Sequence, residues 1–432
     1  MPEHEAVAKS LNGVSLYTHF DHLNPPIGPD GTPYKFYGGI RAEVIEANRP
    51  IGWSEHHGGY WMAAGYPELM ELMRNTEAFS NDAVTFPRYG TNEKLMLAGQ
   101  DDPEHKRARL LVNEPFSPGR VVDFSPMLRE NVNALIDGVI ENGHADVARI
   151  IGDPIPAILT AIVMGLPAED GPRFFQWAAA MAQEHISNPE MAAPKIKEMY
   201  AYFEEAIEER RRKPGDDVLS RVVHAKIDGD SLNMEELLGF CTVLLLGGID
   251  NTSRLIATSL WRLAWDFELR CRLRREPKTI PLAVDEFLRF YSPITIGRLV
   301  LKDTTLSGVT MKRGQYVMLM LPIGNRDPRA FPYPDTFIAD RSPNKHLALG
   351  IGIHRCLGAH ILRVESQVVI EEFLKRIPDF ELDRSNKAVW MSAQVSGMRR
   401  VPIVFEPGKR AGTRLPGSGV QAWLKNANVM AA

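Results

Sequence analysis

The segment from about Met234 to Trp265 constrains the fold more than any other part of the sequence, because it predicts one long helix. Its most apolar part, from about Leu237 to Ile249, is interrupted by glycines. That part is also shorter than the ~20 residues that span a bilayer. A buried helix therefore explains the composition better than a membrane span, and we expect a soluble protein organised around one central helix.

Helical spacing recurs elsewhere, whereas strand-like sequence is short. Strands are expected only at about Gly59–Ala63, Leu299–Leu301 and Gln315–Leu321. Strands and helices do not alternate in the βαβ manner. The sequence therefore predicts a mainly α protein with a minor β region. Further helices are expected at about 67–73, 196–207, 282–290 and 359–376.

Composition excludes several classes of protein. The chain has 432 residues, of which 44% are hydrophobic and 24% charged, and its formal net charge is -4. These values exclude a disordered chain, a collagen-like fibre and a polycation built for nucleic acid. The three cysteines, Cys241, Cys271 and Cys356, are too few for a disulfide framework or a four-cysteine zinc site. Residues 1–11 lack the apolar core of a signal peptide, so a cytoplasmic location is expected.

The chain divides into three predicted parts. Residues 1–50 are rich in Pro, Gly and His and predict an irregular N-terminal arm. Residues 51–407 predict a single catalytic domain, and residues 408–432 an additional C-terminal tail. Within the domain, residues 79–100 have no period and predict a long irregular loop, a feature that is often functional.

The segment His346–Gly358 carries the most specific chemistry. Gly350 and Gly352 could open a dinucleotide-binding loop, but Arg355 stands where that loop needs its third glycine. Alternatively, the glycines let the backbone pass close to a flat ligand and present Cys356 just before a helix, whose free amides favour the thiolate. A thiolate held in this way is a ligand for haem iron. A lone cysteine is otherwise more often a buried structural residue.

This segment resembles the proximal haem-binding loop of the cytochrome P450 superfamily, F-G-x-G-x-H-x-C-x-G. Leu349 departs from that pattern, since the family usually has Phe at this position, where the ring tunes the iron. The resemblance extends from about Gly59 to Pro407 and is closest in appearance to soluble bacterial members, including the camphor hydroxylase group. It implies the P450 fold, with haem b between the long central helix and the loop. It also places Cys356 on the iron and Gly350 against the haem.

Two other motifs of the family are recognisable. Glu286 and Arg289 form an E-x-x-R sequence, which alone is usually a solvated pair on one helix face. The resemblance implies that they form a buried structural charge cluster with Arg341, which fixes the cysteine loop.

The resemblance also implies four partners for the two haem carboxylates. His105 and Arg109 match the H-x-x-x-R helix of the family, and Arg298 and His354 match the other two positions. Each of these residues alone could be an ordinary surface cation. Together they suit charge-assisted hydrogen bonds to carboxylates.

The central helix resembles the oxygen-binding helix of the family, A/G-G-x-D/E-T. Gly247 and Gly248 are expected to let the helix open against the haem, at a cost of about 1 kcal/mol each relative to alanine. Asp250 stands at the position of the acid that feeds protons inward. Asn251 replaces the usual threonine; its amide can hold a water but cannot relay a proton as a hydroxyl does. Thr252 lies about 100° further round the helix.

These matches imply a haem-thiolate monooxygenase. It would activate O2 with electrons from NAD(P)H, delivered by a separate ferredoxin or flavodoxin with its reductase. It would hydroxylate or O-demethylate a small hydrophobic substrate, such as a monoterpenoid or simple aromatic. The expected walls of the substrate pocket are Phe86, Val243, Leu246, Gly247, Ile294, Ile296 and Val395, and the expected basic docking surface is Arg107, Lys345, Arg355 and Arg363.

Two alternatives remain. A peroxide-driven peroxygenase of the same fold would usually carry an Arg-Pro pair in place of Asp250 and Asn251. A non-catalytic haem sensor would need no acid in that helix.

Overall fold

The structure is a computed structural model, which describes residues 15–87, 95–227, 229–412 and 417–430. The first 14 residues of the predicted arm, and residues 413–416 and 431–432 of the predicted tail, lie outside this description. The helices are α2 (Tyr34–Glu46), α3 (Tyr66–Arg74), α4 (Glu104–Val112), α5 (Pro118–Val122), α6 (Ser125–Asp137), α7 (Pro154–Val163), α8 (Gly171–Ala179), α9 (His185–Ser187), α10 (Pro189–Arg212), α11 (Val218–Val223), α12 (Met234–Trp265), α13 (Phe267–Arg275), α14 (Ile280–Tyr291), α15 (Leu321–Gly324), α16 (Ala359–Arg376) and α17 (Ser418–Met430).

Short 3₁₀ and π segments punctuate these helices. The 3₁₀ turns are η1 (His56–Gly58), η2 (Asn81–Ala83), η4 (Ala168–Asp170), η6 (Pro277–Thr279) and η7 (Gly352–His354), and the π turns are η3 (Ala148–Gly152) and η5 (Ala180–Glu184).

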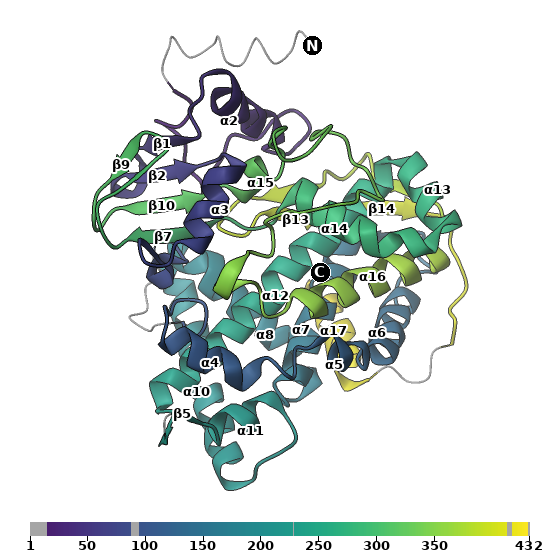
Figure 1. Cartoon of the computed structure of the whole chain (residues 1–432). Helices are drawn as coiled ribbons and strands as arrows, with labels where there is room; N and C mark the ends of the chain where they lie inside the picture. The colour runs from purple at the N-terminus through teal and green to yellow at the C-terminus, as the bar shows by residue number, and fades with distance from the viewer. Residues whose placement is uncertain (1–14, 88–94, 228, 413–416, 431–432) are drawn as a thin grey trace.

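The strands form small sheets beside the helical body. The largest has the order β1-β2-β10-β7-β3, in which β2 and β10 are parallel and the other neighbours antiparallel. This sheet and α2 occupy one side of the molecule, and most helices the other (Figure 1). The strands are β1 (Ile51–Ser54), β2 (Tyr60–Ala63), β3 (Phe79–Ser80), β4 (His144–Asp146), β5 (Lys226–Ile227), β6 (Asp230–Ser231), β7 (Ile296–Val300), β8 (Thr304–Leu306), β9 (Val309–Met311), β10 (Tyr316–Leu319), β11 (Phe380–Leu382), β12 (Val389–Met391), β13 (Gly397–Arg400) and β14 (Pro402–Phe405).

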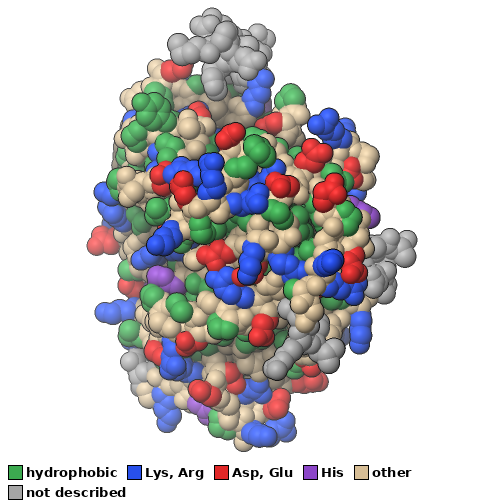
Figure 2. Space-filling view, turned by 90° about the vertical axis from the view of Figure 1, so that its right-hand side faces the viewer, with side chains coloured by type: hydrophobic (Ala, Val, Ile, Leu, Met, Phe, Trp, Pro, Cys, Tyr) green, Lys and Arg blue, Asp and Glu red, His purple; other side chains and the backbone are tan. Residues whose placement is uncertain are grey.

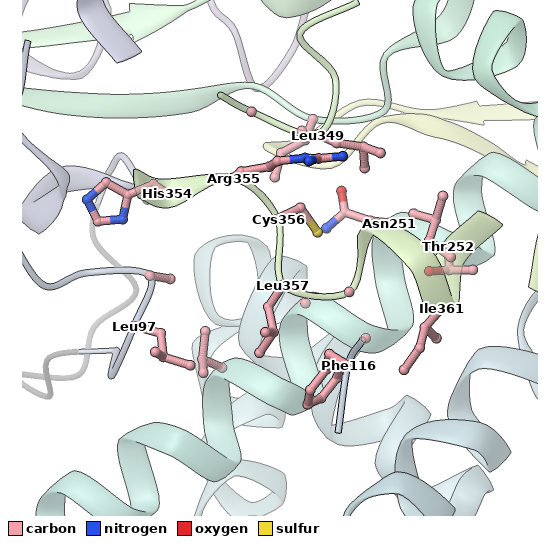
Figure 3. Close-up of a pocket in the computed structure, with 18 of the residues that line it drawn as sticks. Leu97, Phe116, Asn251, Thr252, Leu349, His354, Arg355, Cys356, Leu357 and Ile361 are labelled. Carbon is pink, nitrogen blue, oxygen red and sulfur yellow. The ribbon is translucent and has the colours of Figure 1, made fainter. Parts of the chain in front are cut away.

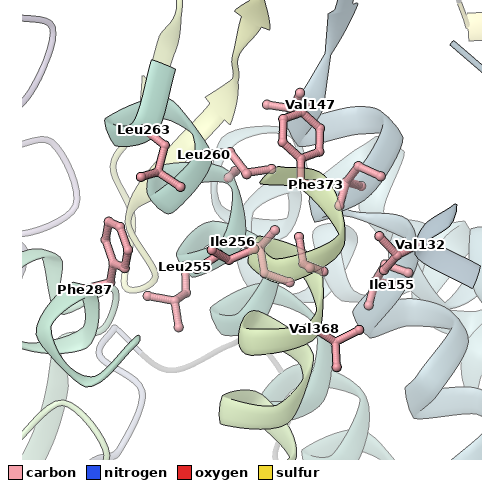
Figure 4. Packing of buried hydrophobic residues seen from close by; sticks show 14 of the residues in the cluster. Val132, Val147, Ile155, Leu255, Ile256, Leu260, Leu263, Phe287, Val368 and Phe373 are labelled. Atoms are coloured by element: carbon pink, nitrogen blue, oxygen red, sulfur yellow. The ribbon is translucent and has the colours of Figure 1, made fainter. Parts of the chain in front are cut away.

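Helix α12 is the axis of the core. It begins at a capping box in which the Asn233 side chain accepts from the Glu236 amide at 3.0 Å and the Glu236 carboxylate accepts from the Asn233 amide at 2.8 Å. Figure 4 shows Leu255 and Ile256 of α12 packed among side chains of the surrounding helices, Phe373 of α16 among them. Each fully buried residue of this kind contributes about 1.5–3 kcal/mol. The core therefore fixes α12 against α6, α7, α14 and α16.

The predicted opening of this helix at its glycine pair is wrong, because α12 is continuous through Gly247 and Gly248. Gly248 has a different explanation. A Cβ at this position would lie 2.5 Å from Oγ1 of Thr160 on α7, so glycine allows the two helices to approach closely.

The structure differs from the sequence prediction at both ends of the chain. Residues 1–50 were expected to be irregular, yet α2 forms within them and buries Tyr37 and Ile40 in an apolar cluster. The pattern of α2 is weakened by two adjacent glycines, Gly38 and Gly39. In the expected tail, α17 packs against α8 and η4 and buries Val420 completely.

The described surface gives no sign of a membrane span, since none of the described helices is both long and apolar enough to cross a bilayer. Figure 2 shows one face of the molecule, on which acidic and basic side chains are intermixed and hydrophobic side chains are scattered. This face therefore carries no extended field of one sign.

Candidate active site

A cavity lies between α12 and the loop that carries Cys356. The loop contributes Cys356 to one wall, and α12 contributes Gly247, Gly248 and Asn251 to another. Figure 3 shows the Cys356 sulfur and the side chains of Asn251, Thr252, Leu349 and His354 around this space. The predicted approach of the central helix and the cysteine loop is therefore present.

Glycines give the cysteine loop its shape. Gly350 and Gly352 have φ angles of 66° and 72°, a region that disfavours other residues. The turn is closed by hydrogen bonds from the Gly350 amide to the Leu347 carbonyl and from the Cys356 amide to the Leu349 carbonyl, both at 2.8 Å. Cys356 is thus held by backbone geometry, three residues before α16 begins.

In the protein alone, burial outweighs the expected preference of the helix amides for the Cys356 thiolate, although the Gly358 amide acts in the expected direction. Burial raises the pKa of the Cys356 thiol, and this outweighs the Gly358 amide and the arginines Arg109, Arg363 and Arg355, which lower it. The thiol is half-exposed only because it faces the cavity. A metal ion that binds this sulfur must therefore displace its proton.

The predicted charge cluster is fully formed beneath the loop. Glu286 and Arg289 are 0% exposed, and two hydrogen bonds of 2.8 Å join their side chains. Arg341 approaches the same carboxylate at 3.0 Å. Asn344 and the Ile338 amide also donate to Glu286, at 3.1 and 2.9 Å. Every lone pair of the buried carboxylate is used, which makes its burial tolerable.

One residue connects this cluster to the cysteine loop. The Asn325 carbonyl accepts from Arg289 Nη1 at 3.0 Å, and the Asn325 side chain accepts from the Leu347 amide at 2.7 Å. Leu347 belongs to the turn that closes on Gly350. The cluster therefore holds the loop through Asn325, a residue that the sequence interpretation did not assign to it.

The four predicted carboxylate partners meet at one end of the cavity. His105 and Arg109 of α4, Arg298 of β7 and His354 of η7 all line it. The rings of His105 and His354 have centroids 4.1 Å apart. Burial, followed by the nearby charges of His105, Arg298 and Arg109, lowers the pKa of His354 to about 3. This end of the cavity therefore has a positive potential that an anion would relieve.

Two of these polar groups, Arg298 and His354, have no acidic partner among the described residues, whereas His105 Nδ1 lies 3.4 Å from Asp102. Arg298 is 2% exposed, donates from Nη1 to the Gly297 carbonyl at 2.8 Å and forms no ion pair with any described carboxylate. Its burial lowers the pKa of its guanidinium to about 10. The Nε2 atom of His354 has no hydrogen-bond partner in the described structure. Together with a cysteine in the same cavity, these groups fit haem, which brings two carboxylates and an iron that needs an axial ligand.

Asp250 does not line the cavity and lies in a buried polar cluster. It is 5% exposed, its Oδ1 lies 3.6 Å from Nε of Arg254, and its Oδ2 accepts from Gln183 at 3.4 Å. Arg254 also pairs with Asp153 and donates to the Met398 carbonyl at 2.8 Å. Burial raises the pKa of Asp250 although Arg254 opposes the rise. The spacing of four residues between Asp250 and Arg254 could have predicted their pairing on one helix face. Nothing in the sequence predicts that they also contact Gln183 and Asp153.

Asn251 and Thr252 both line the cavity, although they are adjacent on the helix. The Oδ1 atom of Asn251 is buried and has no hydrogen-bond partner in the described part of the chain. Buried amides are normally satisfied, so this oxygen is available to a ligand or water. Asn251 rather than Asp250 therefore faces the reaction space.

The structure brings together only part of the predicted substrate pocket. Val243, Gly247, Ile294 and Ile296 line the cavity, whereas the other three residues do not. Phe86 packs against Tyr316 in the apolar cluster near α2, at a centroid distance of 4.6 Å. Leu246 packs in the neighbouring helical core, and Val395 pairs with Ile294 through a β-bridge. The cavity is also lined by Val84, Leu97, Phe116 and Leu244, which were not among the predicted pocket residues.

Known proteins resemble the chain along most of its length. The family described as Cytochrome P450 matches residues 60–394. The mycinamicin IV hydroxylase/epoxidase of Micromonospora griseorubida is 33% identical over 334 residues, 74% of this chain and 83% of that protein. The biotin biosynthesis cytochrome P450 of Bacillus subtilis is 30% identical over 391 residues, 87% of this chain and 96% of that protein. The crystal structure of CYP109E1 from Bacillus megaterium in complex with testosterone superposes with a TM-score of 0.79 at 29% identity, covering 87% of this chain and 98% of that one.

Proposed function

The chain belongs to the cytochrome P450 family and is a haem-dependent monooxygenase of that family, and from this premise we propose that Cys356 holds the haem iron. The observation that carries the proposal is the convergence of one thiol and four cationic or imidazole side chains on a single cavity. When bound, haem supplies the activation of O2 and the insertion of one oxygen atom into a C–H bond. The protein supplies position, charge and protons.

His105, Arg109, Arg298 and His354 would hold the two haem carboxylates. The support is the burial of Arg298 without an acidic partner among the described residues and the unpartnered Nε2 of His354. A buried guanidinium without a counter-ion is costly, and a carboxylate would offset that cost. The same anion would restore the pKa of His354 toward its ordinary value.

Protons for the reaction would pass along α12. Asp250, whose pKa is raised by burial, can hold a proton beside the cavity without lining it. Asn251 can keep a water in the cavity through its free Oδ1, and Thr252 adds a hydroxyl on the same wall. We assign Asp250 the role of proton source and Asn251 that of water holder.

The substrate would be small and hydrophobic, such as a monoterpenoid or simple aromatic. Val84, Val243, Ile294 and Ile296 give the cavity an apolar wall, with Asn251 and Thr252 as the nearby polar groups of α12. Such a wall binds by burial of apolar area and offers few polar groups to a highly functionalised ligand. The ferric protein should therefore show saturable spectral shifts with monoterpenoids or simple aromatics. Tighter binding of a steroid or a long-chain fatty acid would contradict this substrate class.

Electrons would arrive from an acidic ferredoxin or flavodoxin at the basic surface of Arg107, Lys345, Arg355 and Arg363. The first three are exposed, but Arg363 is half-buried and paired with Asp285 at 2.8 Å, so its charge is largely compensated. Lys345→Glu should slow reduction at low salt and less so at high salt, because screening weakens the attraction. Lys387→Glu, at an exposed site before β12, makes the same charge change and should have no such effect.

The activity is tested by comparing two oxidant supplies. With NADH and a surrogate ferredoxin system, the holoenzyme should convert the best-binding substrate to a product that contains one atom of O2. Higher coupled turnover with peroxide alone would instead identify a peroxygenase, and spectral binding without turnover under either condition would identify a sensor.

A further inference from the structure

A second cluster of ligand-type side chains lies outside the active-site cavity. Asp21, His22 and His57 each place one ligand-capable atom within 4.8 Å of the other two. They come from two separate parts of the chain, because Asp21 and His22 lie in the segment before α2 and His57 lies in the turn between β1 and β2. None of them has a role in the proposed reaction.

Two of the three side chains are already oriented toward each other. The Asp21 carboxylate accepts from the Leu23 amide at 2.9 Å and from the Asn24 side chain at 2.8 Å, which fixes its direction. Nε2 of His57 lies 2.8 Å from Oδ1 of Asp21. His57 reaches this position from a left-handed backbone conformation, with a φ of 54°, just before Gly58. That conformation is unfavourable for a non-glycine residue, so this placement of the ring is maintained at a cost.

The third side chain, His22, has a defined tautomer. Its Nε2 lies 2.8 Å from the Phe86 carbonyl, which can only accept, so Nε2 carries the ring proton. With the proton on Nε2, the Nδ1 atom of the neutral ring keeps its lone pair for a ligand. The neighbouring Tyr60 hydroxyl is 3.1 Å from Nδ1 but 2.8 Å from the Phe20 carbonyl, the better acceptor for its single proton. Histidines that bind metals typically donate their other ring N–H to a carbonyl in this way.

We propose that Asp21, His22 and His57 form a binding site for one zinc-like divalent ion, with water completing the coordination. Two imidazole nitrogens and one carboxylate oxygen are a set that Zn²⁺ accepts, whereas Mg²⁺ and Ca²⁺ prefer oxygen ligands alone. On binding, the metal replaces the proton between His57 Nε2 and Asp21, and that proton moves to Nδ1 of the His57 ring. The ion would fasten the segment before α2 to the β1–β2 turn, and it would act independently of the haem.

The test uses the holoenzyme without an affinity tag. In equilibrium dialysis against Zn²⁺, the wild-type protein should retain one Zn²⁺ per chain, and Zn²⁺ but not Mg²⁺ should raise its unfolding temperature. His57→Gln should lose both effects, and its haem spectrum should be unchanged because the His57 side chain is partly exposed, at 24%. His56→Gln is the matched control: it changes the adjacent, half-buried histidine, whose Nε2 contacts the His19 carbonyl at 3.1 Å, and should bind as the wild type does.

Asp21→Asn provides a second variant, in case His57→Gln proves unstable, and should also lose the ion. The proposal is overturned if the wild type retains no stoichiometric Zn²⁺. Equal retention by the wild type and by either His57→Gln or Asp21→Asn overturns it as well.

Discussion

Nε of Arg254 lies 3.6 Å from Oδ1 of Asp250, one turn earlier on α12, while the other end of the same guanidinium pairs with Asp153. One buried cation thus serves two buried acids, with exposures of 2% for Arg254, 5% for Asp250 and 6% for Asp153. The pairing holds the Asp250 carboxylate outside the lining of the cavity. Asp250 would therefore need a water or a side-chain movement to reach the reaction space.

Replacement of Arg254 should destabilise the fold strongly. Arg254→Met leaves two buried carboxylates without their cation, which typically costs about 3–5 kcal/mol. The free energy of unfolding from urea titration measures this loss. Arg272→Met is the control, because Arg272 is half-exposed and its pair with Asp340 lies at the surface, where such pairs contribute less than about 1 kcal/mol. Equal losses of unfolding free energy in the two variants would contradict a stabilising role for the buried cluster of Arg254, Asp250 and Asp153.

Asp153 should make stability depend on pH in a defined window. Burial raises the pKa of its carboxyl to about 6, although Arg254 opposes the rise, while the unfolded chain has the ordinary value of 3.8. Between these values the folded state binds a proton that the unfolded chain has released, so this group lowers the free energy of unfolding as pH rises. Asp153→Asn cannot titrate. The difference in the free energy of unfolding, wild type minus variant, should fall by on the order of 2 kcal/mol between about pH 4 and pH 6, and a constant difference would refute the assignment.

Arg298 should affect the haem-free and haem-loaded proteins in opposite ways. Arg298→Met removes a buried cation that has no described acidic partner, so the haem-free protein should be as stable as the wild type or more stable. The loaded variant should lose haem to a scavenging protein about ten to a hundred times faster, since a hydrogen bond to a charged group contributes about 1.5–3 kcal/mol. Unchanged haem loss would remove Arg298 from the carboxylate site.

Asn251 should control how efficiently electrons are used. Asn251→Ala removes the free amide oxygen from the cavity wall, so product per NADH should fall several-fold and peroxide should rise. Asn251→Thr restores a group that can hold water and should retain most of the wild-type ratio. If the alanine variant matches the wild type in product per NADH, Asn251 does not hold the water.

Short-range patterns in the sequence predicted the parts of the site that lie within one element or one loop. Cys356 with its flanking glycines, and Glu286 with Arg289, are examples, since their spacing alone places them together. Arg341 joined Glu286 as the family pattern implied.

The remaining parts depend on contacts between distant segments. Asp153 contacts Arg254 only because η3 packs on α12. Phe86 does not line the cavity, because it packs against His22 in the segment before α2. The helices α2 and α17 could not be predicted from the sequence either, because their own hydrophobic patterns are weak. They are stabilised by tertiary burial of residues such as Ile40 and Val420. Both failures have the same physical origin: the deciding interactions join residues that are far apart in sequence.

The most direct test concerns the sulfur of Cys356. In Cys356→Ser, the red-shifted Soret band of the reduced carbon monoxide complex should disappear, while Cys271→Ser, which changes another free and half-exposed cysteine, should keep it. Retention of that band in the serine variant at position 356 would contradict the central assignment.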